Sequence, residues 1–279
     1  MPIYDHYQKN RQSAIETLRK FKRLVEARPR ILYEFFIRVL TPSEIRRIVR
    51  LDHGILLYIN PLNHLGHYAL DPAGYEPETF DVLARYIKPG QIACDVGANE
   101  GIFTAYMGKL VGPEGKVLAI EPQSRLRDIL EINCRLNGLW NCWFFQNALG
   151  RPQDQTGRLA LYSGLNSGSS SLVKRYYSTV GYEDVQFVTV DTILETCGSD
   201  IIHFMKVDTE GFEAEITEAI EPHLARGKVK LLFLDFHDDI LASRGMSRSA
   251  IHKRVIDSGM RMREGMPDKK NSYILYEWP

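Results

Sequence analysis

The stretch from Ile92 to Thr104 constrains the fold more than any other part of the chain. It begins as a short apolar run without helical spacing, passes through Asp95, Gly97 and Gly101, and continues into an apolar segment with helical periodicity. This order is typical of a buried parallel strand, a tight turn and a helix start. In open α/β sheets, ligands bind at the carboxyl ends of the strands, where glycines let backbone N–H groups approach them. We therefore expect a ligand at this turn.

The residues of the turn favour one class of ligand. A dinucleotide fingerprint requires a third glycine where this chain has Asn99, and that glycine admits the pyrophosphate. S-adenosyl-L-methionine carries no phosphate, and we expect Asp95 to face its ammonium and ribose region. The next strand, Lys116 to Ile120, ends in Glu121, which is placed to accept both hydrogen bonds of a ribose diol. The alternative is a structural Gly-x-x-x-Gly turn, which is common in α/β proteins.

Seven sequence blocks between about residues 74 and 236 resemble the FkbM-type S-adenosylmethionine-dependent methyltransferases. They follow the family's order: Gly74-Tyr75-Glu76-Pro77, Asp95-Val96-Gly97-Ala98-Asn99-Glu100-Gly101, Glu121-Pro122, Asn147-Ala148, Gly168-Ser169-Ser170-Ser171-Leu172, Thr189-Val190-Asp191-Thr192 and Lys206-Val207-Asp208-Thr209-Glu210-Gly211-Phe212-Glu213. The resemblance implies S-adenosyl-L-methionine as cofactor and a sheet with one antiparallel strand near its edge. It also implies methylation of a hydroxyl on a saccharide or secondary metabolite, although some members methylate peptide amides.

The alternation of apolar segments predicts the fold. Strand and helix patterns alternate six or seven times, which indicates a doubly wound, mostly parallel seven-stranded α/β sheet of the Rossmann-like type. We assign residues 54–279 to this domain and residues 1–53 to an N-terminal helical extension, with helices beginning near residues 13, 30 and 41. A strand pair is expected between Gly54 and Leu70. The segment 150–186 lacks the βα rhythm and is expected to form the acceptor-side wall or, alternatively, a mobile surface loop.

Composition limits the partners and the compartment. The 279 residues hold 35 Lys+Arg and 35 Asp+Glu, which argues against a nucleic-acid partner. The first 50 residues are nevertheless basic, with 12 Lys+Arg against 5 Asp+Glu. The extension is expected to cover the domain, to shield the pocket or to form a homodimer; docking on an anionic membrane or carrier is the alternative. No transmembrane segment or signal peptide is predicted. The four cysteines have no paired spacing, so we expect reduced thiols and a cytoplasmic enzyme.

The expected cofactor site combines the strand-end residues with the matching blocks. Asn147 ends the third strand and could bond the edge of the adenine, while the resemblance places Glu76 beside the cofactor; helix capping is the alternative role for Glu76. The expected cofactor-binding residues are Glu76, Asp95, Gly97, Ala98, Asn99, Gly101, Thr104, Glu121, Pro122, Asn147, Ala148 and Asp208.

Three residues are the expected catalytic groups: Asp208, Glu210 and His237. The carboxylates of Asp208 and Glu210 should repel each other, which would raise the pKa of one of them and make it a useful base. His237, with an ordinary pKa of about 6.5, is expected either to be the base or to orient the acceptor. Alternatively, Asp208 caps the next helix. No resident metal is predicted, although a divalent cation held by Asp208, His237, Asp238 and Asp239 is a further alternative.

The leading functional hypothesis is O-methylation of a small-molecule or glycan acceptor. N-methylation of a peptide side-chain amide is an alternative that the same acids could serve. An NAD-dependent oxidoreductase and a non-catalytic nucleotide-binding subunit are alternatives from other classes. Asn99 opposes the oxidoreductase, and the presence of both Asp208 and Glu210 opposes the non-catalytic subunit.

Overall fold

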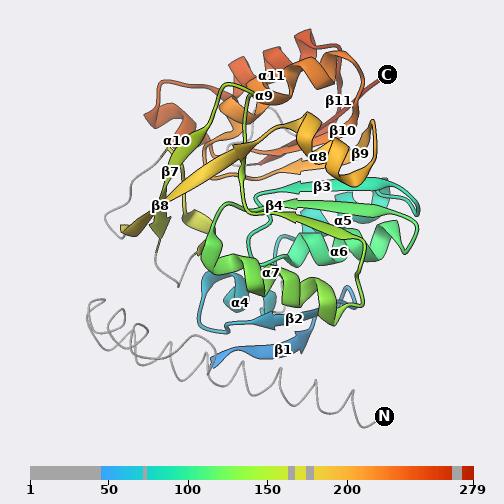
Figure 1. Ribbon diagram of the computed structural model, residues 1–279, viewed down its shortest axis with the longest axis vertical. Coiled ribbons are helices and arrows are strands. Elements are labelled where there is room, and N and C mark those ends of the chain that lie inside the picture. Colours follow the sequence, from blue (N-terminus) through green and yellow to red (C-terminus); the bar gives the residue numbers. More distant parts are fainter. Residues whose placement is uncertain (1–44, 72–73, 163–166, 174–178, 266–271) are drawn as a thin grey trace.

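The computed structural model describes residues 45–71, 74–162, 167–173, 179–265 and 272–279 (Figure 1). Its main sheet has seven strands in the order β11-β12-β10-β9-β3-β4-β5. The strands are β3 (Ile92–Val96), β4 (Lys116–Ile120), β5 (Cys142–Phe145), β9 (Ile202–Val207), β10 (Val229–Asp235), β11 (Arg261–Gly265) and β12 (Tyr273–Glu277). β5, β4, β3, β9 and β10 pair in parallel, whereas β12 runs antiparallel to β10 and β11. This confirms the predicted doubly wound sheet with one antiparallel strand near its edge.

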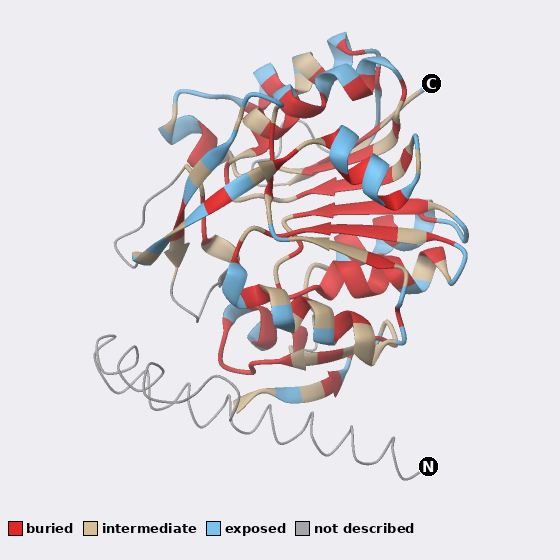
Figure 2. Cartoon of the chain, viewed as in Figure 1, coloured by how far each residue is buried: buried red, intermediate tan, exposed pale blue. Residues whose placement is uncertain are grey.

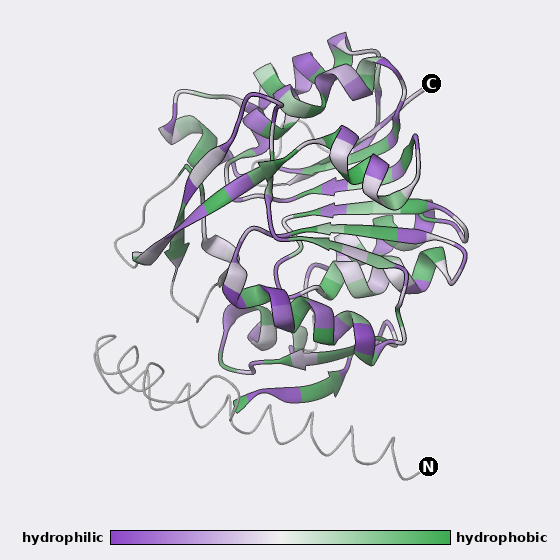
Figure 3. Cartoon of the chain, in the orientation of Figure 1, coloured by the Kyte–Doolittle hydropathy of each residue, from purple (hydrophilic) through white to green (hydrophobic). Residues whose placement is uncertain are grey.

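Helices cover both faces of this sheet, which is why its central strands are apolar throughout. α5 (Pro77–Tyr86), α6 (Ile102–Val111) and α7 (Ser124–Leu136) pack on one face, and α8 (Val190–Cys197), α9 (Glu213–Ala225) and α11 (Arg248–Asp257) on the other. All five residues of β3 are buried, and alternate side chains enter opposite cores, Ala93 one and Cys94 the other. Figure 2 shows the buried strands between the helices, and Figure 3 shows their apolar character.

The first described elements differ from the prediction. β1 (Arg47–Arg50) pairs antiparallel with β2 (Leu56–Ile59) and is followed by α4 (His64–Ala69). The prediction of a strand pair between Gly54 and Leu70 is therefore wrong, because β2 pairs upstream and the later part is helical. Asn63 starts α4 by accepting a 2.7 Å hydrogen bond from the Gly66 N–H. β1 also falls inside the range 1–53 predicted to be helical; the helices expected before residue 45 lie outside the described residues.

A second, three-stranded sheet includes parts of the segment 150–186 that was predicted to lack the βα rhythm. It contains β6 (Ala148–Leu149), β7 (Thr156–Tyr162) and β8 (Thr179–Val188) in the order β6-β8-β7, and β7 and β8 form an antiparallel hairpin. Ser171 adds a single bridge to Ala160. This sheet stands at the edge where the parallel strands end (Figure 1).

Three smaller features complete the fold. α10 (Asp238–Ser243), which the sequence did not predict, follows β10, and a 3-10 turn covers Ser167–Ser169. All four cysteines are buried and free, as expected for reduced core thiols. Within the described ranges, no helix has the length and apolar character needed to span a membrane.

Candidate functional site

A cavity of about 350 Å³ opens at the carboxyl ends of β3, β4, β9 and β10, within the ~300–1,000 Å³ range of small-molecule sites. α4, the start of α5 and the second sheet complete its wall. Most of the predicted site residues line it: Glu76, Gly97, Ala98, Asn99, Glu121, Pro122, Asn147, Ala148, Asp208, Glu210 and His237. The carboxyl ends of the parallel strands therefore bring together residues that are up to 161 positions apart in the sequence.

The turn after β3 is packed too tightly for a side chain at its first glycine. Gly97 has φ 86°, and a Cβ atom there would lie 1.9 Å from the backbone oxygen of Asp208. This close approach joins the turn after β3 to the turn after β9. Glycine at this position is thus required both by the left-handed backbone and by the neighbouring strand end.

Three non-glycine residues with left-handed backbones gather at the cavity. Glu76, Asn99 and Glu210 have φ 43°, 50° and 51°, no other described non-glycine residue has a positive φ, and all three line the cavity. Such conformations cost roughly 1–3 kcal/mol each and concentrate at ligand sites. We therefore take this cavity as the candidate functional site.

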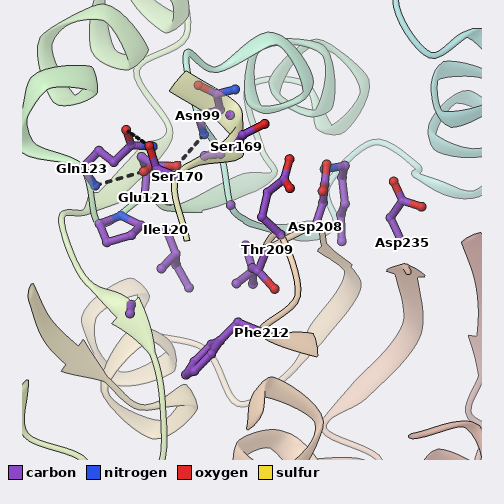
Figure 4. Close-up of a pocket in the computed structure, with 18 of the residues that line it drawn as sticks. Asn99, Ile120, Glu121, Gln123, Ser169, Ser170, Asp208, Thr209, Phe212 and Asp235 are labelled. Carbon is purple, nitrogen blue, oxygen red and sulfur yellow. Dashed lines mark hydrogen bonds and ion pairs between the residues drawn. The ribbon is translucent and has the colours of Figure 1, made fainter. Parts of the chain in front are cut away.

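Glu121 is held in place by the backbone around it. One carboxylate oxygen accepts a 2.9 Å hydrogen bond from the Asn99 N–H, and the other accepts one of 2.9 Å from the Gln123 N–H (Figure 4). The side chain lines the cavity although the residue is only 6% exposed, and burial raises its pKa. A carboxylate held at the cavity wall in this way fits the paired hydroxyls of a ribose.

Asp95, Gly101 and Thr104 lie behind the cavity lining, which corrects the prediction that they face the ligand. The Asp95 carboxylate accepts a 2.6 Å hydrogen bond from the Thr104 hydroxyl, and its other oxygen lies 3.9 Å from the Lys206 ammonium. Gly101 starts α6 and packs against Leu130. Burial raises the pKa of Asp95. These residues hold β3, α6 and β9 together beneath the site.

Lys206 is a buried cation. It belongs to the last of the matching sequence blocks, but the sequence predicted no role for it. Its ammonium lies 2.9 Å from the Asp208 carboxylate and 4.7 Å from the centre of the Phe103 ring. Burial alone would lower its pKa, but the carboxylates of Asp208, Asp95 and Glu76 outweigh burial and raise it. In turn, burial would raise the pKa of Asp208, but Lys206 and His237 lower it overall. Asp208 is therefore ionised and weakly basic.

The carboxylates around His237 favour its protonated form. Its Nδ1 lies 2.9 Å from the Glu213 carboxylate, and its Nε2 lies 3.8 Å from carboxylate oxygens of both Asp208 and Glu210. Burial lowers the pKa, but the hydrogen bond to Glu213 and the nearby charges raise it to about 10. A protonated imidazole donates hydrogen bonds and cannot accept a proton, which favours the predicted orienting role over that of a base.

Asp235 is a site residue that the sequence analysis missed. It is the last residue of β10 and lines the cavity, but the prediction extended this strand to Phe236 and so placed Asp235 inside it. Oxygen atoms of Glu76, Asp208 and Asp235 lie within 4.8 Å of one another. Asp208 was predicted as a site residue because it lies at the end of a strand. Asp235 would have been predicted for the same reason if the predicted strand had ended one residue earlier.

The alternative four-residue metal set is not assembled. Asp238 forms a 2.9 Å ion pair with Arg248, and Asp239 is exposed and does not line the cavity. Only Asp208 and His237 of the four reach the cavity.

Comparison with known proteins identifies the family. Residues 95–252 match the family described as "Methyltransferase FkbM domain", which is more than half of the chain. The chain belongs to the FkbM methyltransferase family. The domain is therefore a methyltransferase domain with S-adenosyl-L-methionine as its cofactor, and the cavity at the strand ends, with Glu121 at its wall, fits that cofactor.

The FkbM chain is also similar to individual proteins. It is 33% identical over 78 residues to a protein-L-isoaspartate O-methyltransferase of Triticum aestivum; the match covers 28% of this chain and 34% of that protein, so the chain spans about a third of the length of this relative. Among solved structures, it resembles an S-adenosylmethionine-dependent methyltransferase from Aquifex aeolicus (TM-score 0.43, 16% identity, 75% of this chain and 94% of that chain). It also resembles Aeropyrum pernix fibrillarin in complex with S-adenosyl-L-methionine (TM-score 0.46, 12% identity, 85% and 84%).

Proposed function

We propose that this protein transfers the methyl group of S-adenosyl-L-methionine to a hydroxyl of a neutral, polyhydroxylated acceptor, such as a saccharide or a secondary metabolite. The observation that supports this acceptor is the charge of the cavity beside β9 and β10. Four carboxylates line it there, against two cations: Glu76, Asp208, Glu210 and Asp235 against Lys206 and His237. Ionised carboxylates accept hydrogen bonds from hydroxyl groups, whereas they repel an anionic acceptor.

The cofactor is assigned to the other half of the cavity. Glu121 is proposed to accept the ribose hydroxyls, and Asn147 and Ala148, after β5, to border the adenine. The turn Gly97 to Asn99 is proposed to lie along the amino-acid part. This arrangement directs the transferred methyl group toward the carboxylates at the ends of β9 and β10, because those strands flank β3 on the side away from β4.

A peptide side-chain amide is the second candidate acceptor. An amide is neutral and donates hydrogen bonds, so the same carboxylates could bind it. A carboxylate acceptor, as the name of the wheat relative implies for that protein, is disfavoured because it would bring a further negative charge among four.

Methyl transfer to acceptors of matched size tests the proposal. The purified protein is incubated with methyl-labelled S-adenosyl-L-methionine and one of three probes: a neutral methyl glycoside, the corresponding uronate, or an asparagine-containing peptide. We expect label in the glycoside and none in the uronate. Label only in the uronate or only in the peptide would contradict hydroxyl methylation of a neutral acceptor. Calorimetric titration should show binding of S-adenosylhomocysteine and not of NAD; the reverse would support the oxidoreductase alternative.

Two expectations for the whole protein also remain proposals. We propose a cytoplasmic location, supported by the four free cysteines. We also propose that the basic N-terminal segment forms a homodimer contact or covers the domain; residues 1–44 of it lie outside the described part of the chain.

A further inference from the structure

Asp235 lies beside Asp208 in the cavity, but the two side chains have very different hydrogen-bond and ion-pair partners. Leu234 of β10 pairs in parallel register with Val207 of β9, so the next residues, Asp235 and Asp208, leave the sheet side by side. Figure 4 shows both side chains at the ends of neighbouring strands, and both line the cavity. Two equivalent positions therefore carry two carboxyl groups whose surroundings can be compared directly.

Each of the other carboxylates around Asp235 has a positively charged neighbour or accepts a hydrogen bond. Asp208 accepts a 2.9 Å hydrogen bond from Lys206, Glu210 lies 3.8 Å from the His237 imidazole, and Glu76 accepts a 3.2 Å hydrogen bond from the Thr79 hydroxyl. Within the described ranges, Asp235 has no ion pair at 4.0 Å or less and no side-chain hydrogen bond. Its carboxyl group is thus the one in this cluster that is left for an incoming hydroxyl.

We infer that Asp235 is the general base that takes the proton of the acceptor hydroxyl, while Asp208 stays ionised between Lys206 and His237 and orients the acceptor. This inference rests on the proposed hydroxyl methylation. It assigns the proton transfer to a residue outside the catalytic group expected from the sequence, Asp208, Glu210 and His237.

The charges that face Asp235 suit a base. Burial is the largest influence and raises its pKa, the carboxylates of Asp208 and Glu76 raise it further, and His237 and Lys206 oppose them; the result is a pKa of about 7. From β12, the register partner Tyr273 gives its hydroxyl hydrogen to Glu264. A base whose pKa lies near the working pH is ionised in a useful fraction of molecules. It also has a higher proton affinity than a carboxylate with a lower pKa.

The chemical step is balanced by these groups. Bound S-adenosyl-L-methionine supplies the methyl group, so that an oxygen–carbon bond forms as the carbon–sulfur bond breaks and its electron pair leaves on sulfur. Asp235 receives the hydroxyl proton and afterwards releases it to solvent. Asp208 remains ionised throughout because the Lys206 and His237 charges lower its pKa.

A titration of the aspartate carboxyl groups tests this inference without an acceptor. The full chain, labelled with ¹³C at the aspartate carboxyl carbons and saturated with S-adenosylhomocysteine, is followed by NMR from pH 4 to 9. We expect one resonance to titrate near pH 7, to be absent in Asp235→Asn and to remain in the matched control Asp239→Asn, an exposed residue outside the cavity. A resonance of Asp235 that titrates near the ordinary value of ~3.9 would overturn the inference.

Turnover gives a second arm, measured with the neutral methyl glycoside. Asp235→Asn should lower kcat by ~10²-fold or more and remove the rising limb of the pH profile near pH 7, whereas Asp239→Asn should keep both and both variants should bind S-adenosylhomocysteine like the wild type. Wild-type kcat in Asp235→Asn, or activity lost to EDTA and restored by Mg²⁺, would overturn the assignment of Asp235 as base. Failure of the wild type to bind S-adenosylhomocysteine would instead contradict the proposed function itself.

Discussion

At the scale of single residues, burial and neighbouring charge decide what each carboxyl or imidazole group can do. Asp208 and Asp235 have the same side chain and adjacent positions, yet the pKa of the first is lowered and that of the second is raised to about 7. The difference follows from the Lys206 ammonium, which lies 2.9 Å from Asp208. Identical residue types at equivalent strand ends can therefore differ in proton affinity.

Replacing Glu121 tests the ribose assignment. Glu121→Ala should weaken binding of S-adenosylhomocysteine by about 1.5–3 kcal/mol, the scale of hydrogen bonds to a charged group. Glu121→Gln, which keeps the shape, should weaken it less. Calorimetric titration of the three proteins measures this, and unchanged affinity in Glu121→Ala would place the ribose elsewhere.

The charge of His237 predicts a pH dependence of stability. Its pKa in the folded protein, about 10, lies above the unfolded value of ~6.5, so the stabilisation is fully present below pH ~6.5 and is lost as pH rises toward 10. Urea unfolding should show wild type more stable than His237→Gln by about 1.5–3 kcal/mol at pH 6, with the difference shrinking by pH 10. A difference that stays constant across this range would contradict a charged His237.

At the scale of elements, the site depends on contact between the turns after β3 and β9. Gly97→Ala would place a Cβ atom 1.9 Å from the Asp208 backbone oxygen, and a backbone carbonyl cannot move without shifting the strand end. We expect a loss of at least about 3 kcal/mol in the free energy of unfolding and ~10-fold or more in affinity for S-adenosylhomocysteine.

Gly198→Ala is the matched control for Gly97→Ala. Gly198 ends α8 with φ 64° and ψ 48°, in the left-handed helical region, and nothing lies within 4 Å of a Cβ atom placed there. The control should therefore show only the backbone cost of about 1 kcal/mol and normal affinity. Equal effects in the two variants, measured by urea unfolding and calorimetry, would show that the contact between the turns is unimportant.

At the scale of the whole molecule, a buried ion pair joins the β1–β2 unit to the turn after β3. The Arg46 guanidinium lies 2.8 Å from the Glu100 carboxylate, with side chains 9% and 1% exposed, and Asn63 donates a further 2.7 Å hydrogen bond to Glu100. The segment before β3 is therefore tied to the loop that carries Gly97 and Asn99.

Removing Arg46 tests this connection. Arg46→Ala leaves a buried carboxylate without its cation and should destabilise the protein by about 3 kcal/mol. The control Lys253→Ala breaks an ion pair whose side chains are 74% and 59% exposed and should cost no more than about 0.5 kcal/mol. Thermal or urea unfolding of both variants measures the difference, and equal effects would show that the buried pair contributes little.

The sequence by itself determined the class of the sheet, the turn after β3 and a set of strand-end residues that line the cavity. These features depend on local patterns: apolar runs give the buried strands, and polar residues after parallel strands meet at one edge. The strand pairing before β3 was not predictable in this way. β2 pairs with upstream residues that were assigned to the N-terminal helical extension.

Only the tertiary structure decided the ionisation of the site and which residues reach it. Asp95 and Thr104 lie behind the lining because they bond each other and approach Lys206, an arrangement set by packing between β3, α6 and β9. The pKa of His237 depends on Glu213 and Glu210, and that of Asp235 on Asp208 and Glu76, which is 159 positions away in the sequence. Charge interactions depend on distance in space and on burial, and neither quantity is contained in the order of the residues.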